Sequence, residues 1–474
     1  YQLNTTSYFI SLNWKNITLV TITEIMNITY CSTRGKQKGL RFEDVVLGGL
    51  ATDGGLYVPE HIPPISMKEI EKMRTMSFPE LAFEVISRYI SVNDIPHSSL
   101  REIINKSFAS FRSPEVTPCV KKKEFWVLEL FHGPTFAFKD VALQFLGNLF
   151  EFFLLRGNQQ SKITILGATS GDTGSAAIHG LRGKKNVNCF ILYPRGKVTE
   201  IQERQMITIP DTNVHCINID GNFDDAQAIV KAAFADVAFR EEVKLGAINS
   251  INWARVLAQI TYYFYAWLRV TDSVKPEQRT DRINFAVPTG NFGDILAGYY
   301  AKLMGLPVGR LIVATNENDV LHRFLKEGSY TKKQSTLTIA PSMDISVSSN
   351  FERYLYYLAD KNTSTLATWM TTFESTGVLT MSEKLIRVAR SEFASHPSSQ
   401  GEILKAMRSV WDKEAYLVCP HTATAVNAVR ELGMPPEKTV ILATAHPAKF
   451  EEAVSKALSG VSIPDRPSQL EELY

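Results

Sequence analysis

The sequence has few features that would connect it to a membrane, a metal or a disulfide framework. Its 474 residues include five cysteines, which lie far apart: Cys31, Cys119, Cys189, Cys216 and Cys419. An odd number of widely spaced cysteines argues against a disulfide framework or a Cys-x-x-Cys zinc site and fits a reducing compartment. No stretch approaches the ~20 consecutive apolar residues of a membrane helix. The nine histidines lack metal-binding spacing such as His-Glu-x-x-His, so we expect no metal site.

The sequence also lacks an excess of charge of either sign. Lys and Arg number 51 against 49 for Asp and Glu, which gives a formal net charge of +2. This balance provides no basic field for nucleic-acid binding. Hydrophobic residues are 45% and charged residues 21%, as in ordinary globular domains with a large core. We expect about three folding units in a cytoplasmic monomer or small homo-oligomer that binds a small molecule, with no membrane or nucleic-acid partner.

Residues 1–28 differ from the rest of the chain. They are rich in Asn, Thr and Ile. They lack the charged start and apolar core of a secretory signal and the Arg-rich amphipathic pattern of a mitochondrial one. We therefore expect a nonfunctional extension, with Met26 as a plausible natural start.

Beyond residue 112, short β-branched runs alternate with helical patterns. The runs that we predict to be strands are Ile163–Leu166, Asn188–Tyr193, Ile283–Val287, Leu311–Ala314 and Val440–Ala443. Strands separated by helices imply crossover connections and mostly parallel sheets that are covered on both faces. The sequence therefore predicts an α/β protein.

The first candidate for chemistry is Lys139, within His-Gly-Pro-Thr-Phe-Ala-Phe-Lys-Asp at residues 132–140. The residues that follow have apolar side chains at helical spacing, so we expect Lys139 at the start of a buried helix. Burial would lower the pKa of its amine and make it nucleophilic, as Schiff-base lysines require. The alternative is a lysine that reaches water or pairs with Asp140.

Two glycine-rich loops each follow a predicted strand. Residues 167–177 (GATSGDTGSAA) and 288–294 (PTGNFGD) lead into helices, whose unpaired N–H groups suit a carboxylate or phosphate. Neither loop matches the dinucleotide or P-loop fingerprint, and each could be an ordinary turn with a Ser or Thr cap. Because parallel strands end at one edge of a sheet, the loops could hold two ends of one small molecule.

Thr444 follows the last predicted strand, at the start of Thr-Ala-His-Pro-Ala-Lys-Phe. Its hydroxyl could reach a ring nitrogen at the same edge of the sheet. A buried threonine bonded to its own backbone is the more common explanation for such a residue.

Together these motifs resemble the threonine synthase family, in particular its fungal-type branch. The resemblance extends from Ser32 to about Val461 and includes residues 51–59 (ATDGGLYVP) and 249–255 (NSINWAR). The family consists of pyridoxal-phosphate enzymes of the tryptophan-synthase-β fold type. It implies fold type II, with two open, mostly parallel sheets, flanking helices and a helical N-terminal domain.

The resemblance also implies domain boundaries. An N-terminal domain would span residues 29–112, and a large domain would comprise residues 113–148 and 270–474. A small α/β domain, residues 149–269, would be inserted between the two parts of the large domain.

Roles in cofactor binding follow from the same resemblance. Lys139 would bond covalently to pyridoxal 5'-phosphate and, once released, shuttle protons. Thr444 would contact the ring nitrogen, where a neutral hydroxyl tempers the electron sink. The cofactor phosphate would bind to the loop of Gly290, Asn291, Phe292, Gly293 and Asp294.

The substrate would be held by two further groups. Its carboxylate would bind to the loop of Ser170, Gly171, Asp172 and Thr173. Asn252 and Arg255 would contact its phosphate, because a guanidinium forms paired hydrogen bonds with phosphate oxygens.

The implied reaction converts O-phospho-L-homoserine and water to L-threonine and phosphate, by γ-elimination followed by β-addition. One alternative is a related phospho-lyase that yields 2-oxobutyrate. Another is a noncatalytic protein that binds the cofactor or an anion. The presence of Gly-Asn-Phe-Gly-Asp at 290–294 and of the motif at 444–450 favours the synthase.

Overall fold

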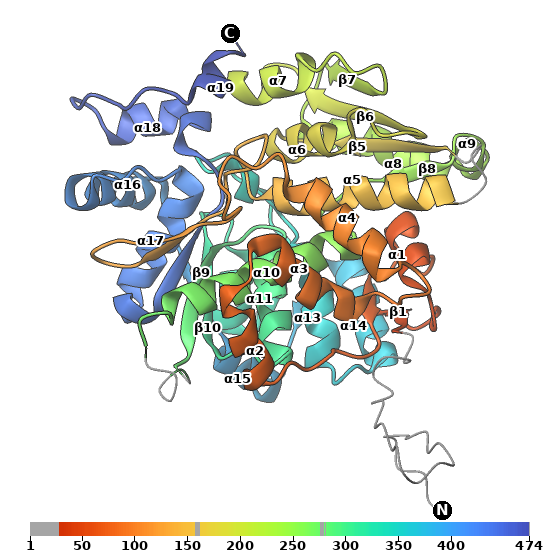
Figure 1. The fold of residues 1–474 in the computed structure, drawn as a ribbon, viewed down its shortest axis with the longest axis horizontal. Helices are drawn as coiled ribbons and strands as arrows, with labels where there is room; N and C mark the ends of the chain where they lie inside the picture. Colours follow the sequence, from red (N-terminus) through yellow and green to blue (C-terminus); the bar gives the residue numbers. More distant parts are fainter. Residues whose placement is uncertain (1–27, 157–161, 275–278, 280, 474) are drawn as a thin grey trace, which may run out of the picture.

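The computed structural model describes residues 28–156, 162–274, 279 and 281–473. The extension expected over residues 1–28 therefore lies outside the described residues, apart from Ile28. The described residues form two larger sheets and two short antiparallel pairs of strands, with helices around and between the larger sheets, as Figure 1 shows.

The larger sheet has six strands in the order β13-β10-β9-β14-β4-β3. Its strands are β3 Cys119–Lys121, β4 Trp126–Glu129, β9 Ile283–Pro288, β10 Val308–Thr315, β13 Phe393–Pro397 and β14 Thr439–Ala443. Neighbouring strands are parallel except at the edge, where β3 runs antiparallel to β4.

The smaller sheet has the order β7-β6-β5-β8, and its strands are parallel. They are β5 Ile163–Ala168, β6 Val187–Pro194, β7 Val214–Ile219 and β8 Leu245–Ala247. Each run that the sequence predicts to be a strand falls within one of these two sheets. The predicted α/β class with two mostly parallel sheets is thus confirmed.

The α-helices up to residue 270 are α1 Phe42–Gly48, α2 Met67–Lys72, α3 Phe78–Ile86, α4 His97–Phe108, α5 Lys139–Arg156, α6 Asp172–Leu181, α7 Glu200–Ile207, α8 Phe223–Ala235, α9 Val237–Glu242 and α10 Trp253–Val270. Helices α1 to α4 belong to the N-terminal segment that was expected to be helical. That segment also contains an antiparallel pair of strands, β1 Tyr30–Ser32 and β2 Tyr57–Pro59.

The later helices accompany the larger sheet. They are α11 Gly293–Leu303, α12 Val320–Glu327, α13 Phe351–Leu358, α14 Thr363–Thr376, α15 Glu383–Glu392, α16 Gln400–Glu414, α17 Pro420–Glu431, α18 Glu451–Ala457 and α19 Ser468–Glu471. A second antiparallel pair joins β11 Ser329–Thr331 to β12 Val378–Thr380.

Helices α5 and α10 connect the regions of the two sheets. α5 packs against α6 beside the smaller sheet and against α10, and α10 packs against α11 beside the larger sheet. Every residue of α10 except Arg269 is buried, as expected for a helix that is surrounded by other elements. The first turns of these two helices carry Lys139 and Arg255, so both side chains start from the interior of the protein.

The C-terminal helix α19 lies beside α7 of the smaller-sheet region, as Figure 1 shows. Leu470 is fully buried and packs against Phe136 and Ile201, and Arg204 Nη1 donates to the carbonyl oxygen of Leu473 at 2.8 Å. The C-terminal segment therefore connects α7 to the turn that precedes Lys139.

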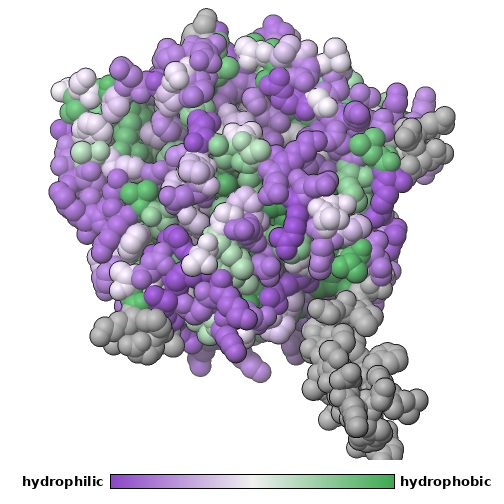
Figure 2. Space-filling model, in the orientation of Figure 1, coloured by the Kyte–Doolittle hydropathy of each residue, from purple (hydrophilic) through white to green (hydrophobic). Residues whose placement is uncertain are grey.

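The face of the molecule in Figure 2 is mostly polar, and its apolar residues form small separate groups. Within the described residues, no helix has both the length and the apolar composition that a membrane span needs. The large apolar side chains are instead concentrated between the helices and the two sheets.

The contact between α5 and α6 depends on two glycines. A Cβ atom added to Gly147 would lie 2.0 Å from the carbonyl oxygen of Gly180, and one added to Gly180 would lie 2.5 Å from that of Leu143. Backbone atoms cannot move away as a flexible side chain can. The helices approach this closely because neither glycine has a side chain.

We therefore predict that Gly147→Ala destabilises the protein by about 1–3 kcal/mol, because the added methyl group forces α5 and α6 apart. Thermal and urea unfolding would measure the loss. The matched control is Gly401→Ala in α16, where no heavy atom lies within 4 Å of the added carbon. Equal stability of Gly147→Ala and the wild type would contradict this account of the helix contact.

Candidate active site

A cavity lies at the carboxyl ends of β9 and β14, beside the first turns of α5, α6, α10 and α11. Its walls consist of Phe138, Lys139, Asp172, Thr173, Ser250, Arg255, Gln259, residues 288–295, Ser342, Met343, His421, Thr444 and Ala445. This is the position at which open α/β sheets bind ligands. Segments from distant parts of the chain meet here.

Most of the predicted site residues line this cavity. They are Lys139, Asp172, Thr173, Arg255, Gly290, Asn291, Phe292, Gly293, Asp294 and Thr444. Ser170, Gly171 and Asn252 are not among the lining residues. Ser170 is exposed, and Gly171 lies so close to Gln202 that an added Cβ would be 2.3 Å from Oε1 of that side chain.

Asn252 is not among the lining residues, and its side-chain amide bonds within the fold. Its Oδ1 accepts from the backbone N–H of Ala254 at 3.1 Å and caps α10, while Nδ2 donates to the carbonyl oxygen of Val46 at 2.9 Å. Both polar ends of the amide are therefore used within the fold. The oxygen accepts from one of the free N–H groups at the start of α10, as a helix cap does. The structure does not bring Asn252 to the cavity.

Lys139 is the first residue of α5, and its side chain faces Asp172 instead of the neighbouring Asp140. Its Nζ lies 3.7 Å from Oδ2 of Asp172. Asp140 instead accepts from Thr135, at 2.8 Å from the backbone N–H and 2.7 Å from Oγ1. Burial lowers the pKa of Lys139, and the charges of Lys449 and Arg255 lower it further while Asp172 opposes them. The Lys139–Asp140 pair, one alternative from the sequence, does not form.

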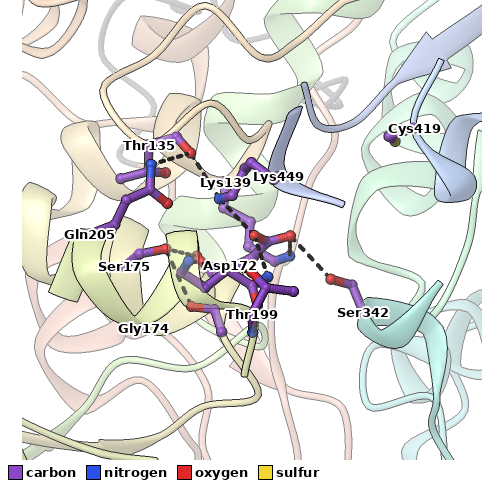
Figure 3. A network of polar contacts seen from close by, with 12 residues as sticks. Thr135, Lys139, Asp172, Gly174, Ser175, Thr199, Gln205, Ser342, Cys419 and Lys449 are labelled. Carbon is purple, nitrogen blue, oxygen red and sulfur yellow. Dashed lines mark hydrogen bonds and ion pairs between the residues drawn. The ribbon is translucent and has the colours of Figure 1, made fainter. Parts of the chain in front are cut away.

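Asp172 is a buried carboxylate with partners on several elements, as Figure 3 shows. Its Oδ1 lies 2.7 Å from Nζ of Lys449 and accepts from Nε2 of Gln202 at 2.9 Å. Its Oδ2 accepts from Oγ of Ser342 at 3.1 Å. Burial on its own would raise the pKa of Asp172, but Lys449 and Lys139 hold it well below the usual range. The group is therefore a carboxylate anion at the boundary between the two sheets.

The loop at residues 290–293 is held in an unusual conformation. Phe292 has φ of +62°, which is costly for a bulky residue and persists only where the surrounding structure fixes it. Its buried ring packs on Phe351 and Phe393. Two hydrogen bonds fix the loop backbone. Ser348 Oγ donates to the carbonyl oxygen of Gly290 at 2.7 Å, and the N–H of Asn350 donates to the carbonyl oxygen of Asn291 at 3.0 Å.

This loop leads into α11, whose N-terminus lies at the cavity. Among the described residues, no side chain caps this helix, although its first turn includes the lining residues Gly293 and Asp294. Free N–H groups and the positive end of the helix dipole favour a bound anion. The cavity therefore has an anion-binding end at α11.

Two charged side chains of the cavity have buried atoms without hydrogen-bond partners. Arg255 lacks partners at Nε and Nη1, and Asp294 lacks one at Oδ2, among the described residues. Burial lowers the pKa of Arg255 to about 10. Burial also raises the pKa of Asp294 to about 6, although Tyr262 and Tyr263 donate to its Oδ1 at 2.6 and 2.8 Å. Buried polar atoms normally have partners, and on residues that line a cavity a ligand can supply them.

The structure adds lining or neighbouring residues that the sequence did not indicate. His421 accepts from the backbone N–H of Ser342 through Nε2 at 3.1 Å, and burial lowers its pKa to about 3. This ring is therefore neutral and helps to fix the turn that also contacts Asp172. Lys449 is within the motif at 444–450, but nothing in the local pattern points to its partner. In the described part of the chain no cluster of three or more His, Cys, Asp or Glu could hold a metal.

Three known families match the chain. "Threonine synthase N terminus" matches residues 29–108, "Pyridoxal-phosphate dependent enzyme" matches 110–368, and "Threonine synthase, C-terminal" matches 422–474. Threonine synthase of Schizosaccharomyces pombe is 50% identical over 471 residues, which cover 92% of this chain and 90% of that protein.

Solved structures of the same kind share the fold. The crystal structure of threonine synthase from yeast has a TM-score of 0.89 at 44% identity and covers 94% of both chains. The pyridoxal-phosphate-bound threonine synthase from Brucella melitensis has a TM-score of 0.89 at 43% identity, also over 94% of both chains.

The raised pKa of Asp294 gives a prediction for stability. The unfolded chain releases this proton near pH 4, whereas the folded chain retains it up to about pH 6. The proton therefore stabilises the fold below about pH 4, and this contribution is lost as the pH rises through about 6. Between these limits the wild type should lose up to about 3 kcal/mol of unfolding free energy relative to Asp294→Asn.

Urea unfolding of both proteins across this pH range measures the difference, and Asp465→Asn at an exposed position serves as the control. A difference that stays constant, or one that changes in the opposite direction, would contradict the protonation assigned to Asp294.

Proposed function

The chain belongs to the threonine synthase family of pyridoxal-phosphate-dependent lyases, and from this premise we propose roles in binding and catalysis for its cavity residues. Members of the family convert O-phospho-L-homoserine and water to L-threonine and phosphate, and this is the activity of the chain. The residue roles are our proposal, and a cytoplasmic location and a monomeric or small homo-oligomeric state stay predictions.

The cavity has one group that suits covalent attachment of the cofactor and another that suits its phosphate. An amine with a lowered pKa, Lys139, lies at one side, and the uncapped N-terminus of α11 lies at another. We assign the cofactor phosphate to the loop of Gly290, Asn291, Phe292, Gly293 and Asp294. Burial already raises the pKa of Asp294 to about 6, and a bound anion would favour its protonated form further.

Thr444 is the candidate for the ring nitrogen. It is buried, lines the cavity and follows β14 directly. Its carbonyl oxygen accepts from the N–H of Phe138 at 2.8 Å, which connects the end of β14 to the start of α5. This contact supports a fixed spacing between the Thr444 hydroxyl and the Lys139 amine.

When bound, the cofactor supplies the electron sink that loss of the α-proton and departure of the γ-phosphate require. The protein supplies binding and proton transfer. We assign to Lys139 the covalent attachment of the cofactor and, once its amine is free, removal and return of the protons at the substrate carbons. A lowered pKa supports this role, because a general base must be unprotonated near neutral pH.

Arg255 is the proposed ligand of the substrate phosphate. Its side chain is buried in the cavity with two N–H-bearing nitrogens unpartnered, and burial of an unpaired guanidinium is costly unless a ligand anion completes it. Thr173 and the backbone at the start of α6 are the candidates for the substrate carboxylate. Asp172 itself is occupied by Lys449, Gln202 and Ser342.

The observation that carries this proposal is the combination, within one cavity, of the Lys139 amine, the uncapped α11 and two Arg255 nitrogens for which the described residues offer no partner. The direct test is incubation of the purified, cofactor-loaded protein with O-phosphohomoserine. We expect threonine and inorganic phosphate in equal amounts. Formation of 2-oxobutyrate and ammonia alone would identify a phospho-lyase, and binding without turnover would identify a noncatalytic protein.

The matching variant is Lys139→Ala. Without the amine we expect loss of the cofactor's visible absorption band and a fall in turnover of about 10³-fold or more. The control is Lys456→Ala on α18, where the lysine is exposed and pairs with Glu452. A normal band in Lys139→Ala would show that another residue holds the cofactor.

Arg255 and Asn252 allow a paired prediction. Arg255→Met should raise KM for O-phosphohomoserine about 10- to 100-fold, because it removes a charged partner of the phosphate. Asn252→Ala should instead lower the thermal unfolding midpoint, because it removes the cap of α10 at a cost of about 0.5–2 kcal/mol. Steady-state kinetics and thermal unfolding of both variants test the pair. The opposite pattern would return the phosphate role to Asn252.

A further inference from the structure

Two lysines face a single buried carboxylate in the cavity wall. Figure 3 shows both lysines beside Asp172. The Nζ atom of Lys449 lies 2.7 Å from Oδ1 of Asp172, and that of Lys139 lies 3.7 Å from Oδ2. The side chain of Lys449 is fully buried, and that of Lys139 is 11% exposed. The three groups come from α5, from the first turn of α6 and from the motif that follows β14.

The Lys449 ammonium is held in place more firmly than the Lys139 amine. Besides its short contact with Asp172, Lys449 Nζ donates to the carbonyl oxygen of Thr135 at 2.8 Å. That carbonyl also accepts from Nε2 of Gln205 at 3.1 Å. Lys449 therefore has two close acceptors, whereas Lys139 makes only the longer contact with Asp172 among the ion pairs of the described residues.

The charge of Asp172 limits how many of the two lysines it can neutralise. One carboxylate can neutralise one ammonium, so a neutral lysine is least costly where the carboxylate already has a close cationic partner. If Asp172 had only Lys139 as its partner, the pair would hold Lys139 in its protonated form. An ammonium has no lone pair and is neither a base nor a nucleophile.

We propose that Lys449 is a positioning residue of the reaction, which occupies the Asp172 carboxylate and thereby leaves the Lys139 amine free to lose its proton. This inference rests on the role of Lys139 in the proposed function and extends it to a residue with no role there. Lys449 acts through Asp172 and does not itself contact the reacting atoms.

The other titratable groups around Lys139 are consistent with the role proposed for Lys449. Arg255 is a second cation that faces it and opposes its protonation. His421 is neutral because burial lowers its pKa to about 3. Asp140, His179 and His446 interact with Lys449, and Lys449 lowers the pKa of each of them. Asp172 is thus the group that favours the charged form of Lys139, and Lys449 limits its effect.

The test measures the protonation of Lys139 directly in the full-length chain after removal of the cofactor. Trace acylation of amines across a pH series, followed by mass spectrometry of the Lys139 peptide, gives the midpoint of its titration. In Lys449→Gln, which keeps hydrogen-bonding groups but no charge, we expect this midpoint to rise by about 1 pH unit or more. The acidic limb of the kcat profile of the loaded enzyme, which reports Lys139 after its amine is released, should move in the same direction.

Three further variants separate this role from a structural one. Lys449→Arg keeps the charge and should restore the wild-type midpoint. The double variant Asp172→Asn with Lys449→Gln removes the carboxylate and should lower the midpoint again. Lys456→Gln, at an exposed lysine of α18, should leave it unchanged.

An unchanged midpoint in Lys449→Gln would overturn the proposal, and so would failure of that variant to fold, which would show a structural role. The acylation needs no turnover, so its result is independent of the product assay. Wild-type protein that bound no cofactor would refute the proposed function and would leave the acylation midpoint readable.

Discussion

The arrangement of the site depends on one buried carboxylate between two lysines. Asp172 starts α6 beside the smaller sheet, and its partners Lys449 and Ser342 belong to segments beside the larger sheet. A carboxylate cannot remain charged inside a protein without close cationic or hydrogen-bonding partners. The requirement to satisfy Asp172 therefore holds the edges of both sheet regions together around the cavity, and it sets the electrostatic surroundings of Lys139.

Other residues of the cavity have energetically unfavourable backbone conformations or polar contacts, which the packing around them stabilises. Phe292 adopts a left-handed backbone conformation, and its ring is fixed by Phe351 and Phe393. Arg255 and Asp294 have buried polar atoms that lack hydrogen-bond partners in the described part of the chain. Such departures from ordinary packing are concentrated where a protein must bind a ligand. Here they surround the positions proposed for the two phosphates, one of the cofactor and one of the substrate.

Much of the fold could be predicted from the sequence because it depends on local patterns. The β-branched runs at residues 163–166 and 283–287 lie in β5 and β9, and the apolar spacing after Lys139 produced the buried helix α5. The positions of Thr444 and of the 290–294 loop at one cavity followed as well, because parallel strands end at the same edge, whereas the place of Lys139 in the site followed from the family resemblance.

Other parts of the site depend on contacts that no local pattern contains. Lys449 and its acceptor Thr135 are 314 residues apart in the sequence, so their pairing could not be read from spacing. Asn252 and Arg255 are one helical turn apart, yet one caps α10 and the other lines the cavity. Which of two such neighbours faces a ligand is decided by tertiary packing. The same holds for Ser170, which the fold leaves exposed.

The central claim is that Lys139, and not the nearby Lys449, carries the cofactor. Borohydride reduction of the loaded protein would fix the cofactor permanently to the amine that holds it, and mass spectrometry of the digested protein would identify that residue. The account predicts a single reduced adduct on the peptide that contains Lys139. An adduct on Lys449, or reduction that leaves the cofactor unattached, would contradict it.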